Sequence, residues 1–591
     1  MKSISTVLFS LMAYFVFAQL PIDTSKAPSN WFNLDPETDK VNGVGSDRTY
    51  KELLKDKTST PVIVGVIDSG VDFNHEDLKD VMWVNTKEIP GNNIDDDKNG
   101  YADDIHGWNF LGGKDGKNVE NETLELTRIY REQNKKFEGK DEKNLNADEK
   151  KEFAYYQKIK AAFDKKVSEA NQQFTQFNFI KQLFESENSA IKEQLHIDTV
   201  KAADLEKYKP KDQKDEQVLI IVRQIMGQEK DATLESLLKQ FSGYADYFGN
   251  QVKYNLNPEF DPRNIIGDDY SNDKQRDYGN PDCNGPASLH GTHVAGIIGA
   301  NRKNSIGIKG VADNVKIMAV RAIPDGDERD KDVANAIFYA VDNGAKVINM
   351  SFGKMYPYDK EIVDQAVRYA ESKDVLIVHA AGNDGIDIDT ATHFPCKKFL
   401  NGKEAKNWLD IGALNWRQQT RLPAQFSNFG KKTVNIFAPG VDIYSTKTGG
   451  GYLNESGTSM ACPVTAGVAA VIRSYFPDLT AVQVKDIILK SCESDHKKDL
   501  VDKPGKIRFA VKKGDSIKSI CKKYKISEDD IYTMNPGLKE KFGPGEIITI
   551  NGFVKFGTLS QTGGFVNLYK AVQLAMKISK SKSVKGNNPK G

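Results

Sequence analysis

Short runs of apolar residues alternate with amphipathic helical patterns through much of this 591-residue chain. Five runs have the length and continuous apolar character of strands buried on both faces, namely residues 62–67, 315–323, 347–350, 375–378 and 434–437. Between them, residues 332–342 and 360–372 carry apolar side chains at helical spacing. This alternation predicts an α/β fold with a doubly wound parallel sheet covered on both faces. In such sheets, ligands bind beyond the carboxyl ends of the strands.

A highly charged segment, residues 118–255, interrupts this alternation. From Tyr156 to Phe184, apolar residues recur at spacings of three and four, which predicts a long amphipathic helix with a coiled-coil-like stripe. After Pro210, a second helical pattern from Val218 to Tyr244 could pack back on the first. The segment is therefore expected to be a helical hairpin, either purely structural or an arm that docks a partner.

The chain begins with the layout of a secretory signal peptide. Lys2 precedes an apolar run, residues 7–17, and the small residue Ala18 follows it. A membrane anchor is the alternative, but the run is short for a span. We expect cleavage after Ala18, a secreted or periplasmic protein, and no membrane span after cleavage, since no later segment reaches about 18 consecutive apolar residues.

Charge and cysteine content narrow the possible functions. The 82 Lys and Arg residues balance 82 Asp and Glu residues, which excludes a uniformly basic nucleic-acid-binding protein, so no nucleic-acid partner is expected. The five cysteines lie far apart without a CxxC pair. We expect them to be small buried apolar residues, without disulfides.

The first candidate chemistry lies at the end of the first predicted strand. Asp68 follows residues 62–67 directly, where α/β active sites form, and Gly70 permits a sharp turn. His290 and His293 come next, among small residues that would let a helix start close to the sheet. Two histidines three apart could instead bind a metal, but the Glu of an HExxH motif is missing.

Two further motifs follow later strands. Asn383 comes after residues 375–378, and its amide could donate a hydrogen bond to a developing oxyanion or could simply belong to a turn. Ser459 precedes Pro463 and an apolar helical stretch. Because proline is tolerated in a first helical turn, Ser459 is expected near the helix N-terminus, where negative charge is favoured. An ordinary serine N-cap is the alternative.

Taken together, these motifs resemble those of the subtilisin-like serine proteases, the subtilases. The matching strings are V-I-D-S-G-V-D, H-G-T-H-V-A-G, A-A-G-N-D-G and G-T-S-M-A, in the order Asp, His, Asn, Ser. The resemblance covers roughly residues 60–575 without the insertions. It implies a serine endopeptidase acting on protein or peptide substrates, with Ser459 as nucleophile, His290 as base, Asp68 as its orienting partner and Asn383 as oxyanion donor.

The same resemblance implies a substrate-binding edge and a supporting residue. Ser351, Phe352 and Gly353 match the S-x-G string that pairs with the substrate backbone in the family. An extended peptide would bind there as an added strand. His293 would then be structural.

A second interruption, residues 508–550, resembles a lysin-motif (LysM) domain. The strings are V-K-K-G-D-S-I-K-S-I-C-K-K-Y-K-I, I-Y-T-M-N-P-G-L and P-G-E-I-I-T-I. The resemblance implies a βααβ fold and a shallow groove, between residues 514–517 and 535–538, for peptidoglycan or chitin-type glycans. A purely structural insert is the alternative. A cell-envelope glycan-binding protein that uses the protease body as a scaffold is therefore the alternative function.

One acidic segment is a candidate calcium loop. Asp95, Asp97, Asn99 and Asp104 place oxygen ligands at close intervals around a glycine, although the terminal Glu of an EF-hand is missing. A solvated acidic turn is the alternative. A structural Ca²⁺ is expected, and no organic cofactor.

The expected parts are residues 1–18 (signal peptide), 19–59 (N-terminal extension), 60–117 (first part of the subtilase domain), 118–255 (charged helical insertion), 256–507 (second part of the subtilase domain), 508–550 (LysM-like insertion), 551–576 (last subtilase helix) and 577–591 (basic tail). The tail is expected to be disordered.

Overall fold

The computed structural model describes residues 27–227, 233–416, 421–505, 507–524, 528–535, 538, 542–550 and 552–586. The predicted signal peptide lies outside the described residues, and so do Pro536 and Gly537 of the predicted glycan groove. The chain forms two compact units, Met1–Glu120 with Pro262–Gly591, and Asn121–Asp261. Among the described residues, no helix combines the length and apolar character needed to cross a bilayer.

A seven-stranded sheet forms the centre of the first unit, with the order β2-β3-β1-β4-β5-β6-β7. Its strands are β1 (Val62–Asp68), β2 (Gly107–Asn109), β3 (Val315–Arg321), β4 (Val347–Met350), β5 (Leu376–Ala380), β6 (Trp408–Leu414) and β7 (Ile436–Pro439). All neighbours in this sheet pair in parallel. The predicted α/β fold with a parallel sheet is confirmed.

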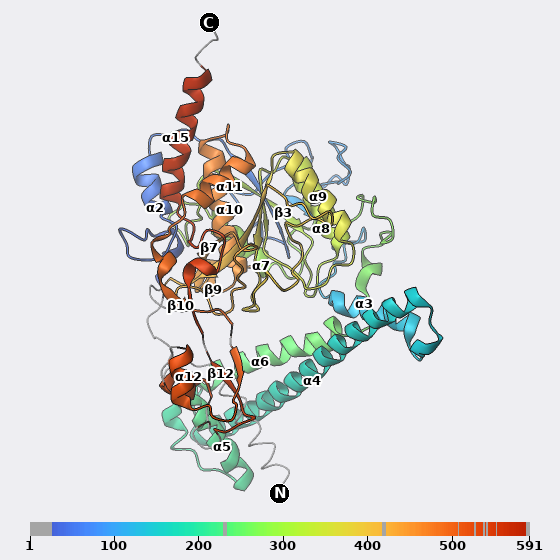
Figure 1. Ribbon diagram of the computed structural model, residues 1–591, viewed down its shortest axis with the longest axis vertical. Coiled ribbons are helices and arrows are strands. Elements are labelled where there is room, and N and C mark those ends of the chain that lie inside the picture. Colours follow the sequence, from blue (N-terminus) through green and yellow to red (C-terminus); the bar gives the residue numbers. More distant parts are fainter. Residues whose placement is uncertain are drawn as a thin grey trace. The chain divides into compact units, whose positions relative to one another are not determined.

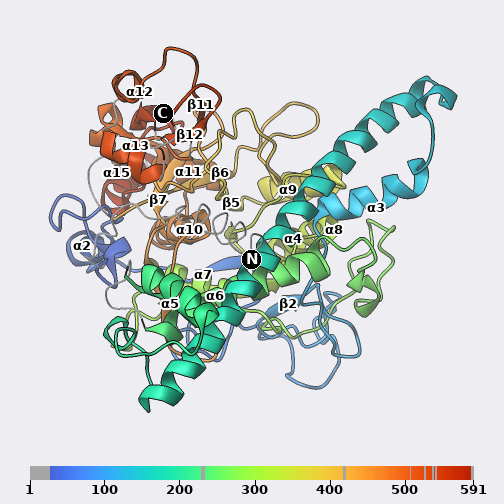
Figure 2. The same ribbon diagram turned by 90° about the horizontal axis from the view of Figure 1, so that it is seen from below.

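Helices cover both faces of this sheet (Figures 1 and 2). Helices α7 (Leu289–Gly299) and α10 (Thr458–Tyr475) lie on one face, and α8 (Asp330–Asp342) and α9 (Lys360–Ser372) on the other. Strand β1 serves both cores, since Val64 and Val66 face the α7 and α10 side while Ile67 faces the other. This burial on both faces explains why the strands appear in the sequence as continuous apolar runs.

Smaller elements complete the first unit. They are α2 (Ser46–Thr49), α11 (Ala481–Lys490), and the antiparallel pairs β8 (Ile443–Thr446) with β9 (Tyr452–Glu455) and β10 (Leu500–Asp502) with β13 (Phe553–Lys555). The last helix, α15 (Leu568–Gly586), corrects the expectation of a disordered tail from residue 577. Met576 and Ile578 pack against the main core, which extends the helix into the basic segment. Residues 587–591 lie outside the described part.

The second unit consists of helices α3 (Glu125–Phe137), α4 (Ala147–Leu195), α5 (Gln213–Met226) and α6 (Leu234–Asn250). Asn146 caps α4, accepting from the backbone N–H of Glu149, whose carboxylate accepts from Asn146 N at 2.9 Å. The 49-residue helix α4 spans about 70 Å at the usual rise. Its apolar stripe packs against α6, where the rings of Phe184 and Phe241 meet edge to face.

The predicted LysM-like segment has the expected βααβ order, with β11 (Ile507–Ala510), α12 (Ile517–Tyr524), α13 (Glu528–Met534) and β12 (Ile547–Ile550). Its small core is its own and consists of Val511, Ile520, Ile531, Leu538, Ile548 and Ile550. Strands β11 and β12 pair antiparallel, with Ile507 opposite Ile550. The first and last residues of the LysM-like segment are therefore neighbours in space.

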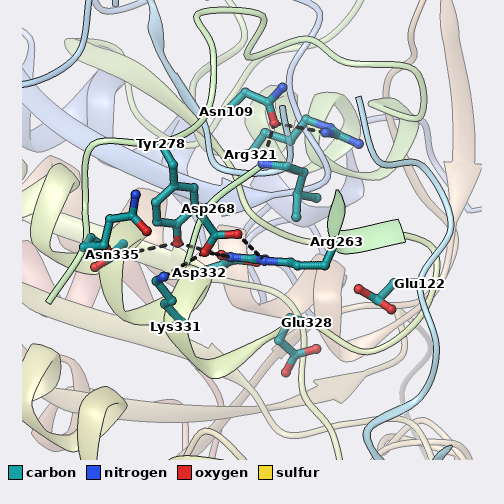
Figure 3. Close-up of polar contacts among 12 residues, drawn as sticks. Asn109, Glu122, Arg263, Asp268, Tyr278, Arg321, Glu328, Lys331, Asp332 and Asn335 are labelled. Carbon is teal, nitrogen blue, oxygen red and sulfur yellow. Dashed lines mark hydrogen bonds and ion pairs between the residues drawn. The ribbon is translucent and has the colours of Figure 1, made fainter. Parts of the chain in front are cut away.

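A buried ionic network binds the chain where it returns from the helical unit (Figure 3). The Arg263 guanidinium contacts Asp268 at 2.7 Å and Asp332 of α8 at 2.6 Å. Lys331 donates to Asp268, and the Tyr278 hydroxyl donates to Asp332 at 2.6 Å. Both carboxylates are fully buried, so each depends on its cationic and hydroxyl partners for compensation.

Candidate active site

Asp68 and His290 form a hydrogen-bonded pair where β1 ends and α7 begins. His290 Nδ1 lies 2.7 Å from Asp68 Oδ1, which also accepts from Ser69 N at 2.8 Å. Glycine at position 291 makes this approach possible, because a Cβ there would lie 2.1 Å from the Gly70 carbonyl oxygen. The carboxylate is 2% exposed and the imidazole 37%, so the pair has one protected and one accessible end.

This pair sets the protonation behaviour of His290. Burial works against the imidazolium, but the charge of Asp68 and the hydrogen bond to it outweigh that effect and raise the pKa of His290 above its usual value. An acceptor at Nδ1 keeps the proton of the neutral ring on that nitrogen, and Nε2 is then the basic atom.

Ser459 lies in the first turn of α10 and is tied to Ser351. The Ser459 hydroxyl donates to the Ser351 carbonyl oxygen at 3.1 Å, and the Ser351 hydroxyl donates to the Ser459 carbonyl oxygen at 2.9 Å. That second bond replaces a helical one, because Pro463 has no N–H to give to the carbonyl four residues earlier. Pro463 lies inside α10, deeper than the expected first turn.

Asn383 follows β5 and is held by Thr458. Its Oδ1 accepts from Thr458 N at 2.9 Å and from the Thr458 hydroxyl at 3.0 Å, which fixes which side of the amide carries the donor. A Cβ built on Gly457 would lie 3.5 Å from Asn383 Nδ2 and 3.5 Å from Ser459 N. The two predicted oxyanion donors therefore approach one point beside Gly457.

The four predicted residues thus form two bonded groups, Asp68 with His290, and Ser459 with Asn383 through Thr458. Within the described residues, no hydrogen bond joins the Ser459 hydroxyl to His290, since the hydroxyl is directed at Ser351. Such bonds are often long or misaligned before substrate binds. All four residues lie where strands end or helices begin.

The predicted substrate edge extends from β4. Ser351 is buried, whereas Gly353 is exposed. In the described part of the chain, the Gly353 backbone N–H and C=O make no hydrogen bond, so both can pair with an added strand. The next residue, Lys354, exchanges two backbone hydrogen bonds with Phe394. His393 explains why Gly353 has no side chain, because a Cβ there would lie 2.7 Å from the His393 ring.

His293 binds the β8–β9 hairpin. Its Nε2 lies 3.1 Å from the Ile443 carbonyl oxygen and 3.2 Å from that of Leu453. Burial, more than any other effect, lowers the pKa of His293 to about 4. A neutral ring that donates to backbone carbonyls is a structural residue rather than a proton carrier.

The acidic loop brings Asp95 and Asp97 together with Glu88, with one carboxylate oxygen of each within 4.8 Å of the others. Asp104 lies outside this group. It is fully buried and accepts from the Tyr339 hydroxyl at 2.7 Å and from Asn99 Nδ2 at 3.0 Å. Burial, partly offset by these bonds, raises the pKa of Asp104 to about 6. Of the four predicted ligands, Asp95 and Asp97 therefore lie in one carboxylate cluster with Glu88, whereas Asn99 and Asp104 contact each other.

Thr458 and Glu88 are two residues of the candidate sites that were not predicted from the sequence. Thr458 stands within the G-T-S-M-A string, but its bonds to Asn383 become visible only when β5 and α10 are placed. Glu88 precedes the acidic loop and is not part of the closely spaced acidic pattern from which the other ligands were predicted. It accepts from the backbone N–H groups of Asp97 and Asp103, which bring the loop around its carboxylate.

Comparison with known proteins identifies the family. The sequence profile of the subtilase family matches residues 59–506, about three quarters of the chain, and the chain belongs to this family. The profile of the LysM domain matches residues 510–542.

Curated relatives match part of the chain. A thermophilic serine proteinase from Bacillus sp. (strain AK1) is 42% identical over 218 residues, 37% of this chain and 49% of the relative. Subtilisin NAT from Bacillus subtilis subsp. natto is 39% identical over 201 residues, 34% of this chain and 49% of the relative. The chain spans about half the length of these relatives. A solved cold adapted subtilisin-like serine proteinase is 30% identical, with 37% of this chain and 72% of that chain covered and a TM-score of 0.31.

Replacing Gly457 by alanine tests the point where the two donors converge. Gly457 has φ 173° and its Cβ neighbours lie at 3.5–3.6 Å, so the methyl group fits the folded chain. It would occupy the position that an oxyanion needs. We expect kcat for ester hydrolysis to fall about 10²- to 10³-fold, the effect of losing one such donor, with an unchanged melting temperature. Full activity in Gly457→Ala would contradict the convergence.

Proposed function

We propose that this chain is a serine endopeptidase that hydrolyses peptide bonds through an acyl-enzyme intermediate. The observation that carries the proposal is the 2.7 Å pair of His290 and Asp68, combined with two donors, Asn383 Nδ2 and Ser459 N, that both lie 3.5 Å from one point, the position of a Cβ built on Gly457. An imidazole with an orienting carboxylate, a hydroxyl and an oxyanion site are the parts that acyl transfer needs.

The proposed reaction starts when the Ser459 hydroxyl turns from Ser351 towards His290. His290 Nε2 takes the hydroxyl proton as Ser459 Oγ attacks the carbonyl carbon, and Asp68 stabilises the resulting imidazolium. The oxyanion accepts from Asn383 Nδ2 and Ser459 N. The imidazolium then gives its proton to the leaving amine, and water releases the acyl group by the same steps with His290 as base.

The substrate would lie along Gly353 as an extended strand. Its exposed, unpaired backbone offers one donor and one acceptor, and main-chain pairing of this kind is independent of side-chain identity. We therefore propose protein or peptide substrates held at Ser351, Phe352 and Gly353.

A calcium ion fits the acidic loop. Glu88, Asp95 and Asp97 crowd three carboxylates together, and a hard cation with oxygen ligands relieves their repulsion. Asp95 and Asp97 were predicted as ligands, and we propose Glu88 as the third. Asn99 and Asp104, also predicted as ligands, stay predictions, since the bond between them uses Asn99 Nδ2 and not the oxygen that a cation would bind. The ion would supply stability, not chemistry.

The LysM domain supports a second function, binding of peptidoglycan or chitin-type glycans at the cell envelope. The supporting observation is the match of residues 510–542 to this domain, with its separate core. Together with the apolar leader of residues 7–17, it favours a secreted or periplasmic location. N-terminal sequencing of the exported protein should then begin at Gln19.

A fluorophosphonate probe tests the proteolytic function. Wild-type protein should be labelled at Ser459 and should cleave a casein substrate, because the probe reports an activated serine. Ser459→Ala should lose both signals while keeping the wild-type circular dichroism spectrum. Equal labelling of the two proteins, or none in folded wild type, would remove the proposal.

Calcium removal tests the acidic loop. At a calcium concentration 100-fold above Kd, binding to the folded state contributes about 2.7 kcal/mol, so chelation should lower the melting temperature measurably. Glu88→Gln should remove this dependence, whereas Asp115→Asn, an exposed acid outside the cluster, should retain it. A melting temperature that ignores calcium would refute the site.

A deletion tests glycan binding. Because Ile507 and Ile550 are cross-strand partners, residues 507–550 can be replaced by a short glycine linker. The intact protein should sediment with insoluble peptidoglycan and the deletion variant should not, while both label equally with fluorophosphonate. Undiminished sedimentation of the deletion variant would discard the glycan role.

A further inference from the structure

Glu455 carries a carboxylate near the candidate active site that has no role in the proposed acyl transfer. It ends β9, four residues before Ser459, and pairs with Ile443 of β8. Helix α7 is tied to this hairpin, because His293 binds the carbonyl oxygens of Ile443 and Leu453. Strand β8 therefore packs against the helix that carries His290, and β9, which carries Glu455, is joined to that helix through Leu453.

The Glu455 side chain is only partly exposed. Nowhere in the described ranges does its carboxylate form a hydrogen bond or an ion pair. Burial raises the pKa of Glu455, His290 lowers it and Asp68 raises it, which places the carboxylate within electrostatic reach of both residues. The groups around it are Asp68 of β1 and His290 of α7, since buried His293 is neutral.

The position relative to His290 indicates which part of a substrate it would meet. In the proposed reaction, His290 gives its proton to the leaving amine, so groups beside the imidazole line the leaving-group side. The Ser351–Gly353 edge, which would pair with the backbone, is bonded to Ser459 from another strand, β4. The Glu455 carboxylate is within electrostatic reach of His290 and has no hydrogen bond or ion pair among the described residues, so it would attract a cation on the leaving-group side.

We propose that Glu455 is a specificity-determining residue that favours substrates with Lys or Arg directly after the scissile bond. The inference rests on the proposed serine endopeptidase function and deepens it. A basic side chain at that position would give the partly buried carboxylate an ion pair that the described part of the chain does not provide.

The first test uses pairs of quenched fluorescent peptides that differ only in the residue after the scissile bond, Lys or Gln, at pH 8.5. Wild type should show a kcat/KM about two- to fivefold higher for Lys, the range expected from an exposed ion pair. Glu455→Gln should lose this preference, and Glu455→Asp should restore part of it. Glu404→Gln, an exposed charge change elsewhere, should keep the wild-type ratio.

Two further readouts separate an electrostatic role from a structural one. The Lys preference should shrink in 1 M salt, where the Debye length is about 3 Å and the exposed part of the ion pair is screened. The charge of Glu455 also stabilises the His290 imidazolium, and a raised pKa keeps the base protonated to higher pH. Glu455→Gln should therefore move the acid limb of the kcat/KM profile for the Gln peptide to lower pH.

Active-site titration with fluorophosphonate keeps the two proposals apart. Folded wild type that does not label would remove the proteolytic function itself. Normal labelling with the same Lys-to-Gln ratio in wild type and Glu455→Gln, or an unmoved acid limb, would overturn only the role of Glu455. Loss of labelling in Glu455→Gln with labelling and preference retained in Glu455→Asp would support a need for the charge.

Discussion

The close approach of the α7 N-terminus to the end of β1 is the constraint on which the candidate site depends. Asp68 and His290 are 222 residues apart in sequence, yet their side chains meet at 2.7 Å because Gly291 lets the helix backbone approach the turn at Gly70. Any side chain at 291 would require that backbone to move. The position of the imidazole, its tautomer and its raised pKa all follow from this single contact.

The long sequence separation between Asp68 and His290 is tolerated because the first unit fixes the chain just before and just after the helical unit. Before it, the Val119 carbonyl oxygen accepts from buried Arg321 of β3 at 2.5 Å. After it, Arg263 binds Asp332 of α8. Both anchors belong to the β3–α8 region, so the insertion adds chain without changing the register of β1 with β3. Its helices can accordingly be long and charged, since their stability comes from packing on each other.

The sequence predicted the elements that are apolar throughout, and the motifs at their ends, because each such signal is local. Strand β6 escaped prediction because Asp410 interrupts its apolar run. In the fold, Asp410 pairs with His379 of β5 at 3.0 Å, directly across the sheet. Glu88 and Thr458 act through partners far away in sequence or through backbone N–H groups. The position of Pro463 inside α10 could not be predicted from the sequence either. It depends on Ser351, which follows β4 and whose hydroxyl replaces the missing helical hydrogen bond.

That replacement shows how the missing N–H of Pro463 fixes the position of Ser459, the proposed nucleophile. Without the Pro463 N–H, the Ser459 carbonyl needs a donor, and Ser351 provides it while accepting the Ser459 hydroxyl in return. The pair fixes the first turn of α10 against the end of β4. It therefore fixes the backbone of Ser459, whose N–H is one of the two proposed oxyanion donors, so this donor would need little reorganisation in the proposed reaction. The same pair directs the hydroxyl at the Ser351 carbonyl oxygen, so in the proposed reaction the hydroxyl must turn towards His290, and the second bond of the pair can hold the first turn of α10 in place while it does so.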